Sequence, residues 1–460
     1  MQKPPSADEA LLSRLLERVS HASACILAVA SITFKDGLRK KALFTITLFA
    51  VLVIVSGFLP WVRADFRIQQ LTRVSLGGMA FFAMVVAIFL AAPNIPDDIS
   101  RKTIFTVMTK PARRWHMLAG KVLGLGYILA IMLVMMGTLT YAHIRYLDYR
   151  MGLDEGELPR LQGHKRTYAA EVEHEGRSLQ LSEPIIESGR ALASGFERIT
   201  YHFRGLDRRQ FRGETAFCQV VLFNHAFSYV DDVGTALFLA RNPSTGAVVT
   251  EIFGAETLQP RFIAFPKAMI DANGDVSITL ITRHDMGSYS AMASSAAVLS
   301  QPSLYVINFV KGLALLFMQG MVLVFIATAA STFLTSTVSV ITALFVYFTG
   351  SLTGIIRDQA LALGTEESIF TMAEHTHGTP EMATGVTRSM QMGVDYLLRY
   401  FYLGISIAFP NLPAFSPTDR MATSEYISLG ALWGGLSYGL VYAAIAFGVA
   451  WAVFQRKEVA

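Results

Sequence analysis

The chain has 460 residues, of which 52% are hydrophobic and 16% are charged, and this excludes an ordinary soluble protein, in which about a quarter of the residues carry charge. The net charge of +4 is small and no dense basic face is evident, so nucleic acid is not expected as a partner. Cys25 and Cys218 are too few for a disulfide framework or a cysteine-type zinc site.

Residues 1–41 are predicted to form a cytoplasmic N-terminus with a helix that lies on the membrane surface. The apolar stretch at residues 22–34 is too short to cross a bilayer. Basic residues follow this stretch directly, at Lys35, Arg39, Lys40 and Lys41. An apolar stretch beside a cluster of cations is typical of a helix at the lipid–water interface.

Six apolar runs are long enough to cross a bilayer core of about 30 Å, which takes about 20 helical residues. They are residues 42–61, 76–92, 117–142, 304–330, 338–356 and 429–454. Basic residues gather at 35–41, 101–114 and 456–457, and six spans place these three segments on one side, which the positive-inside rule makes cytoplasmic. The predicted fold is therefore an α-helical polytopic membrane protein with six transmembrane helices and both termini in the cytoplasm. Spans one to three lie within residues 42–143, spans four and five within 303–356, and the sixth span with the C-terminus within 429–460.

Two features inside the spans predict how the helices pack. Small residues recur four positions apart in three pairs, namely Gly120 and Gly124, Gly430 and Gly434, and Gly435 and Gly439. Such pairs let helices approach closely, and packing within one chain is favoured over a seam between two copies. The fourth run contains one charge, Lys311, near its outer end, where a long side chain can reach the interface.

Residues 144–302 change abruptly to the composition of a soluble domain. Strand-like runs alternate there with turn-forming residues, at 167–172, 198–203, 216–223, 235–240, 247–253 and 276–282. Many short strands separated by turns predict a β-sandwich, inserted between the third and fourth spans on the extracytoplasmic side. Cys218 falls in one of these strands and is interpreted as a small buried hydrophobic residue.

A second extracytoplasmic segment, residues 357–428, joins the last two spans. Its apolar run at residues 396–409 is too short to cross. It fits a re-entrant helix, an interfacial helix, a surface helix of the outer domain, or a chance cluster of aromatic residues. Glu374, His375 and His377 lie in the preceding polar loop, where two imidazoles and a carboxylate are too few for a defined metal site. We interpret them as solvated residues.

The cytoplasmic loop at residues 93–116 contains the most informative pattern. Pro96 is followed by Asp97 and Asp98, whose carboxylates suit the positive end of a helix. Five apolar residues then make a helical face, namely Ile99, Ile104, Phe105, Val107 and Met108. An exposed apolar face needs a cover, which the lipid surface, the chain's own bundle or a partner protein would provide. The cations Arg101, Lys102, Arg113 and Arg114 either meet acidic or lipid groups there or only fix the topology.

Catalytic signatures are absent from the sequence. It contains no GxxxxGK[ST] loop for nucleotide phosphates, no HExxH and no GxSxG. The spans hold almost no acidic residue or arginine, whereas ion-coupled transporters usually need such groups at the bilayer centre. The chain is therefore not expected to be an enzyme or a self-energised pump.

Several of these motifs together resemble one transporter family. They are FKDGLRKK at residues 34–41, IPDDI at 95–99, Thr103-Ile104, KPARR at 110–114, Gly120-Lys121 and the ending FQRKE at 454–458. This arrangement resembles the type-2 permeases of ABC transporters over residues 30–143 and 300–460. The inserted domain resembles in its position that of the gliding-motility and nitrous-oxide-maturation type permeases. Asp98 stands where the family commonly has glutamate, so the negative charge is kept.

The resemblance implies a permease subunit that works with a separate cytoplasmic ABC ATPase. A coupling helix that docks on the ATPase would comprise Asp97, Asp98, Ile99, Arg101, Thr103, Ile104, Phe105 and Met108. An elbow helix and basic residues would comprise Lys35, Arg39, Lys40, Lys41, Arg113 and Arg114. ATP and Mg²⁺ would be bound by the ATPase, so this chain itself needs no cofactor.

The remaining expectations concern surroundings and alternatives. The resemblance implies the inner membrane of a bacterium, a second permease copy or paralogue, and export or mechanical work on the outer side. An extracytoplasmic protein is a further possible partner for the β domain. The alternative from another class is a receptor or scaffold that presents this domain and transports nothing. The substrate does not follow from these residues.

Overall fold

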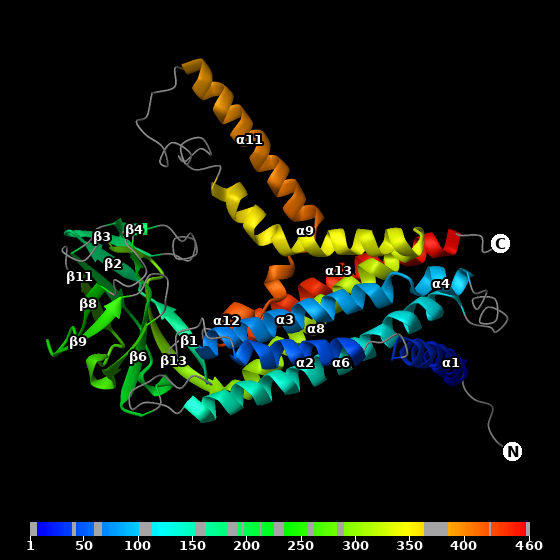
Figure 1. Ribbon diagram of the computed structural model, residues 1–460, viewed down its shortest axis with the longest axis horizontal. Coiled ribbons are helices and arrows are strands. Elements are labelled where there is room, and N and C mark those ends of the chain that lie inside the picture. Colours follow the sequence, from blue (N-terminus) through cyan, green and yellow to red (C-terminus); the bar gives the residue numbers. More distant parts are fainter. Residues whose placement is uncertain are drawn as a thin grey trace.

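A helical bundle and a β domain lie end to end in the computed structural model (Figure 1). The structure describes residues 7–38, 43–58, 67–100, 113–151, 162–181, 191–194, 197–211, 213–224, 234–255, 261–282, 289–362, 385–422 and 425–456. We call the end of the bundle next to the β domain the proximal end and the opposite end the distal end. The last turn of the final helix and the N-terminal helix both lie at the distal end (Figure 1).

Six apolar helices make the bundle. They are α2 (Leu43–Phe58), α3 (Arg67–Ala91), α6 (Arg114–Met151), α8 (Tyr305–Ser331), α9 (Ser336–Ala362) and α13 (Leu429–Arg456). Within the described residues, five helices, all of these except α2, are long and apolar enough to cross a membrane. The described part of α2 has 16 residues, fewer than the roughly 20 that a span needs. The chain is thus a polytopic membrane protein, and the sixth predicted span, residues 42–61, stays a prediction.

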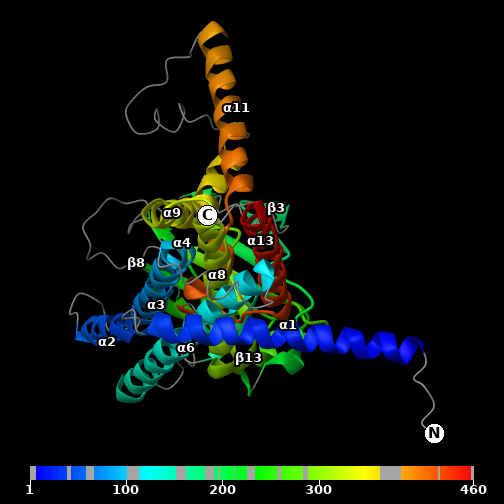
Figure 2. The same ribbon diagram turned by 90° about the vertical axis from the view of Figure 1, so that its right-hand side faces the viewer.

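The helix α1 (Ala7–Gly37) lies across the distal end of the bundle. Figure 2 looks onto this end and shows α1 running crosswise to the helices behind it. The predicted apolar stretch at residues 22–34 is only the second half of the helix. The first half was not predicted because its charged residues give no apolar periodicity, although arginine, leucine and glutamate all favour a helix.

Close approaches between helices occur at glycines, as the small-residue pairs predict. Gly435 and Gly439 of α13 pack on α8, where a Cβ at Gly435 would lie 2.7 Å from Leu315 and one at Gly439 would overlap Met318. A Cβ at Gly434 would instead meet no atom within 4 Å. The pair Gly435 and Gly439 therefore packs within one chain. In the pair Gly430 and Gly434, Gly434 contacts no neighbouring helix of the described chain.

The β domain is inserted between α6 and α8. Its first strand β1 (Gln162–Tyr168) pairs antiparallel with its last strand β13 (Ala296–Leu304), and α8 begins at the residue after β13. The two connections to the bundle therefore leave the domain side by side, which is how a domain is inserted without disturbing the helices around it. The β-rich segment thus fits the predicted inserted domain.

The remaining strands are short and antiparallel. They are β2 (Glu171–His174), β3 (Arg177–Gln180), β4 (Ala191–Ser194), β5 (Arg198–Phe203), β6 (Thr215–Val220), β7 (Phe223–Asn224), β8 (Gly234–Arg241), β9 (Val248–Ala255), β10 (Arg261–Pro266), β11 (Val276–Thr282) and β12 (Tyr289–Met292). Two 3₁₀ turns join them, η3 (Arg208–Gln210) and η4 (Lys267–Met269). The sheets have the orders β1-β13-β6-β10, β3-β2-β5-β11-β8-β9 and β4-β12-β7.

The four-stranded and six-stranded sheets share one apolar core. Tyr201 and Phe238 come from the larger sheet, Cys218 and Phe265 from the smaller one, and all are essentially unexposed. The rings of Phe238 and Phe265 meet across the sheets with centroids 6.1 Å apart. Two antiparallel sheets over a common core are a sandwich-like arrangement. Cys218 is fully buried as predicted, and burial raises the pKa of its thiol.

Strand predictions succeed where alternation is strict. The strands β5 and β11 match the predicted ranges, and the side chains of β11 alternate between buried and half-buried along its whole length. The predicted range 167–172 is wrong as one strand, because the chain turns at Ala169 and Ala170 between β1 and β2. The strands β3, β4, β10, β12 and β13 were not predicted; β13, with the sequence AAVLSQPSL, has few strand-forming residues and pairs on both sides.

The apolar run at residues 396–409 belongs to a longer helix, α11 (Gly385–Ala408). This helix rises obliquely away from the bundle beside α9 (Figure 1). After Pro410 the chain turns through η6 (Leu412–Phe415) and α12 (Thr418–Ala422) back to the start of α13. Leu412 and Phe415 are fully buried in the bundle core. The re-entrant, interfacial and surface interpretations of this segment stay predictions.

Polar contacts tie the β domain to the proximal end. Arg166 Nη1 lies 3.1 Å from Glu425 Oε2, and the amide of Tyr426 donates to the carbonyl of His164 at 2.9 Å. Lys311 Nζ donates to the carbonyl of Ile427 at 3.0 Å, so the single charge of the fourth run is held at this end by the protein. The junction combines residues from β1, α8 and the segment before α13.

Acid should weaken this junction through His164. The side chain is 5% exposed, and burial lowers its pKa from 6.5 to about 4. The unfolded chain therefore binds a proton first, and stability is full above pH 6.5 and falls as the pH drops from 6.5 toward 4. We expect about 2 kcal/mol less stability at pH 5 than at pH 7.5 from this residue. Unfolding titrations at both pH values should give a smaller difference for His164→Gln, and an equal difference would contradict the prediction.

Candidate functional site

The distal end gathers the residues that the sequence singles out, starting with α4 (Asn94–Ser100). The helix α3 ends at Ala91, two residues before Pro93, which cannot continue its hydrogen bonds. The amide of Asp97 donates to the carbonyl of Pro93 at 2.9 Å, which starts the new helix. Asn94 and Asp98 are four positions apart and so lie on one face of α4.

Lys121 of α6 joins α4 to the bundle. Its side chain is 4% exposed, and its ammonium group forms an ion pair with the carboxylate of Asp98. The same Nζ lies 2.8 Å from Oδ1 and 3.1 Å from the carbonyl oxygen of Asn94. A buried ammonium is costly unless its donors are satisfied, and here three acceptors from one helix face surround it. The start of α4 is thereby fixed on α6.

An apolar cluster reinforces the same contact. Its buried members come from α4, α6, α8 and α13, namely Ile95, Met117, Leu118, Ala329, Ala450 and Phe454. Val29 of α1 and Ile99 of α4 pack against this cluster while half-buried. The chain's own bundle therefore covers the apolar face of the described part of the loop. The sequence left three alternatives for what covers the loop helix, namely the lipid surface, the chain's own bundle or a partner protein. The described part of the loop fits the second.

Arg114 is the first residue of α6, and its side chain caps the C-terminal end of α13. Its Nη1 donates to the carbonyls of Phe454 at 2.9 Å and Gln455 at 3.0 Å. Its guanidinium also lies 6.0 Å from the centroid of the Phe454 ring. The last carbonyls of a helix lack partners within the helix and carry partial negative charge, so a guanidinium stabilises them. Arg114 thus joins α6 to α13.

Two glycines let α1 cross α6 closely. A Cβ at Gly120 would lie 2.6 Å from Cβ of Val29, and a Cβ at Gly124 would lie 2.6 Å from the carbonyl oxygen of Ala30. Neither position can hold a larger residue without moving α1. The predicted packing of this pair within one chain is therefore correct, and the crossing fixes the transverse helix on the bundle.

The predicted site residues fall into four groups. Asp98, Ile99 and Arg114 contact the chain's own helices, as described above. Lys35 and Arg113 are exposed at the distal end. Several others lie outside the described residues, namely Arg39, Lys40, Lys41, Arg101, Thr103, Ile104, Phe105 and Met108. Asp97 is half-buried in α4, where its carbonyl accepts from Ser100 Oγ at 2.9 Å.

Sequence reasoning missed Lys121 and Asn94 as functional residues. One signal was available, since Lys121 is a charge in an otherwise apolar run and Asn94 and Asp98 form a polar pair on one helix face. Nothing in the sequence indicated that these three side chains meet, because 27 positions separate Asn94 from Lys121.

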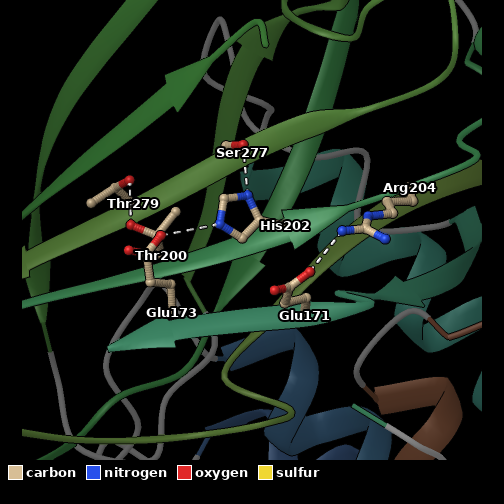
Figure 3. Close-up of polar contacts among 7 residues, drawn as sticks. All are labelled: Glu171, Glu173, Thr200, His202, Arg204, Ser277 and Thr279. Carbon is tan, nitrogen blue, oxygen red and sulfur yellow. Dashed lines mark hydrogen bonds and ion pairs between the residues drawn. The ribbon is translucent and has the colours of Figure 1, made fainter. Parts of the chain in front are cut away.

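The outward face of the larger β-sheet is polar and internally paired (Figure 3). Arg204 Nη2 lies 2.7 Å from Glu171 Oε2, and His202 contacts both Ser277 at 3.0 Å and Glu173 at 3.6 Å. Hydrogen bonds from Ser178 and Gln180, more than the nearby guanidinium, lower the pKa of Glu171. His202 of β5 is opposite both Glu171 of β2 and Ser277 of β11, so the contacts from Glu171 to Arg204 and from Glu173 to His202 join diagonal neighbours. Such cross-strand contacts are typical of a solvated sheet face.

Metal binding finds no support in the part of the chain that the structure describes. Among those residues no group of three or more histidine, cysteine, aspartate or glutamate side chains could hold an ion. Glu374, His375 and His377 lie outside the described residues.

Residues 27–161 match the family model described as ABC-2 family transporter protein. We use the name distal assembly for the contacts of Lys121 with α4, of Arg114 with α13 and of α1 with Gly120 and Gly124, together with the apolar cluster around Ile95. The matched segment begins within α1 and continues past α6, so it contains these residues apart from those of α8 and α13. The match confirms the resemblance to type-2 ABC permeases over residues 27–161, and it supports a permease subunit of an ABC transporter. Over residues 300–460 the resemblance stays a prediction. No curated protein matches the chain. The finer similarity to gliding-motility and nitrous-oxide-maturation permeases stays a prediction.

Proposed function

We propose that the chain is the membrane-spanning permease subunit of an ABC transporter and couples ATP hydrolysis by a separate ATPase to export or to mechanical work. The observation that carries the proposal is the match of residues 27–161 to the transporter family, over the segment that forms the distal assembly. ATP and Mg²⁺ would be held by the ATPase subunit. This chain contributes the lever and the membrane path, and catalyses nothing itself.

The distal assembly has the properties of a lever. Lys121 fixes α4 on α6, Arg114 fixes α6 on α13, and the crossing at Gly124 fixes α1 on α6. A force applied to the loop at residues 93–116 would therefore reach these helices together rather than being absorbed locally. The docking side chains would be Arg101, Thr103, Ile104, Phe105 and Met108, which follow directly after the anchored helix α4. Asp98 and Ile99 anchor the loop in this scheme and do not face the partner.

The orientation that we propose rests on basic residues. Lys35, Arg113 and Arg114 lie at the distal end, and the sequence continues from Lys35 to three further cations outside the described residues, Arg39, Lys40 and Lys41. Under the positive-inside rule these residues would place the distal end in the cytoplasm. The β domain would then lie outside the inner membrane of a bacterium, where its outward face could meet an extracytoplasmic protein. A second permease copy or paralogue would complete the transporter, because two ATPase subunits close on each other around ATP.

Co-purification from native membranes tests the proposal. The full chain should bring down an ATPase, and Ile104→Asp with Phe105→Asp should lower the ATPase activity in the eluate at least about tenfold, because two carboxylates replace the apolar docking face. Ile252→Asp is the matched control, since Ile252 is 73% exposed on the β domain and its change should leave the capture intact. If the wild type brings down no nucleotide-binding protein, the permease proposal fails and the receptor or scaffold reading replaces it.

A further inference from the structure

A lateral groove opens on the bundle between α9, α11, η6, α12 and α13. Its volume is about 750 Å³. Its lining residues are Thr353, Arg357, Leu403, Ser406, Ile407, Asn411, Ala414, Arg420, Ala431, Gly434, Gly435, Tyr438 and Tyr442. None of them belongs to the distal assembly, so the groove is separate from the proposed coupling site.

The groove runs from the proximal end toward the middle of the bundle. Arg357 lies in the last turns of α9, and Arg420 lies in α12, just before α13 begins. Ala431 and Tyr442 line the groove on α13, and 11 residues at 1.5 Å each give a depth of about 16 Å. Half of a bilayer core is about 15 Å thick. The groove therefore has the depth of one leaflet.

Two arginines, Arg357 and Arg420, line the groove at its proximal mouth. Arg420 Nε lies 3.9 Å from Glu425 Oε1, while Arg166 Nη1 lies 3.1 Å from the other oxygen of the same carboxylate. Glu425 thus contacts both guanidinium groups, and the exposed Arg357 lines the same groove as Arg420. The described lining residues include no aspartate or glutamate. Guanidinium groups pair strongly with phosphate oxygens, so the mouth suits an anionic phosphate group.

Several polar groups in the deeper part of the groove hydrogen-bond to other groups of the protein. The hydroxyl of Tyr438 accepts from the amide of Asn411 at 2.8 Å, and Ser406 Oγ donates to the carbonyl of Leu403 at 2.8 Å. The rings of Tyr438 and Tyr442 lie with centroids 4.9 Å apart. These walls present mainly ring faces, methyl groups and glycine backbone. An acyl chain fits this surface better than a sugar or a peptide, whose polar groups would remain unpaired.

We propose that this groove binds one anionic phospholipid from the leaflet on the β-domain side. The phosphate would lie on Arg357 and Arg420, and one acyl chain would extend along Leu403 and Gly434 toward Tyr442. The occupant is a lipid because the groove opens sideways on a membrane-spanning bundle, combines charge at headgroup level with apolar walls below it, and matches one leaflet in depth. The proposal does not depend on the chain working with an ATPase.

Gly434 offers a way to fill the groove without disturbing the protein. A Cβ there would meet no atom within 4 Å, so Gly434→Phe should place a ring in the groove while the helix packing stays intact. Gly448→Phe is the matched control, because Gly448 lies on the same helix outside the groove and is equally open. For the charge, Arg357→Gln and Arg420→Gln are compared with Arg145→Gln at the proximal end of α6.

The test is a titration of the purified full chain with phosphatidylglycerol and phosphatidylcholine of identical acyl chains, with binding counted by native mass spectrometry. The wild type should prefer phosphatidylglycerol, each groove arginine variant should weaken that lipid by about fivefold, and Gly434→Phe should abolish binding of one lipid equivalent. Gly448→Phe and Arg145→Gln should behave as the wild type.

Three outcomes would overturn the proposal. Equal binding of the two lipids by the wild type would show that Arg357 and Arg420 do not select an anionic headgroup. Undiminished phosphatidylglycerol binding by Gly434→Phe would place the lipid elsewhere. A protein dimer that Gly434→Phe dissociates, without any lipid bound to the wild type, would assign the groove to a contact between two copies of the chain.

Discussion

Replacing Lys121 by methionine should lower the free energy of unfolding by about 2 to 4 kcal/mol. Breaking a buried ion pair from one side costs about 3 to 5 kcal/mol, because the remaining partner keeps its charge without compensation. The cost is smaller here, since the Asp98 side chain is 31% exposed and water can reach it. Denaturant titration of the full chain in detergent micelles measures the change. The loss of the hydrogen bonds from Nζ to Asn94 adds to the cost of the broken ion pair.

A double-mutant cycle separates this ion pair from a general effect of altering α6. Asp98→Asn should destabilise at least as much as Lys121→Met, because it leaves the more deeply buried charge unmatched. The double variant should lose less than the sum of the single changes. Lys35→Met is the matched control at the same end, since Lys35 is exposed and its loss should be within about 0.5 kcal/mol. Strictly additive changes would show that Lys121 and Asp98 do not act as a pair.

Alanine at Gly120 and Gly124 should destabilise the chain, whereas alanine at Gly77 should stabilise it. At the first two positions the new methyl would lie 2.6 Å from atoms of α1, so the transverse helix must move, and overpacking of this kind costs about 1 to 3 kcal/mol. A Cβ at Gly77 in α3 would meet nothing within 4 Å, and alanine favours a helix by up to about 1 kcal/mol over glycine.

If glycine-to-alanine substitution lowers the free energy of unfolding at Gly120 and Gly124 but raises it at Gly77, the close crossing of α1 and α6 is the cause of the loss. Cys25 provides a second readout, since it lies half-buried on α1 and should react faster with maleimide when that helix is displaced. Cys218 is fully buried in the β domain and should stay unreactive in the folded chain. Stabilisation by all three alanine substitutions, or an unchanged labelling rate at Cys25, would contradict the close crossing.

The fold could be predicted where the apolar pattern is continuous or strictly alternating. The run at residues 304–330 became α8 almost residue for residue, and the alternation in β11 gave its exact range. The strand β13 could not be predicted, because its place in the sheet depends on partners far away in the sequence. The polar first half of α11 was missed for a related reason, since it carries no long apolar run.

The candidate site was predictable only in part. The loop at residues 93–116 stood out through its helix start and apolar periodicity, and the structure places its first turns against the bundle. Which of those residues face inward could not be read from the sequence, because this depends on the angle at which α4 leaves α3. The pairing of Lys121 with Asp98 could not be predicted for the same reason. The sequence shows both charged residues, but only the tertiary fold brings them into contact.

Site-specific cross-linking tests whether an ATPase docks at the distal end. Ser100 is exposed at the end of α4, and Ser178 is exposed on the β domain. Each is changed to cysteine in a chain that carries Cys25→Ser and Cys218→Ala, and membranes are treated with a short bifunctional reagent. We expect the cysteine at position 100 to cross-link to a nucleotide-binding subunit and the cysteine at position 178 not to do so. Cross-linking of such a subunit at position 178 and not at position 100 would show that the ATPase does not dock at the distal end.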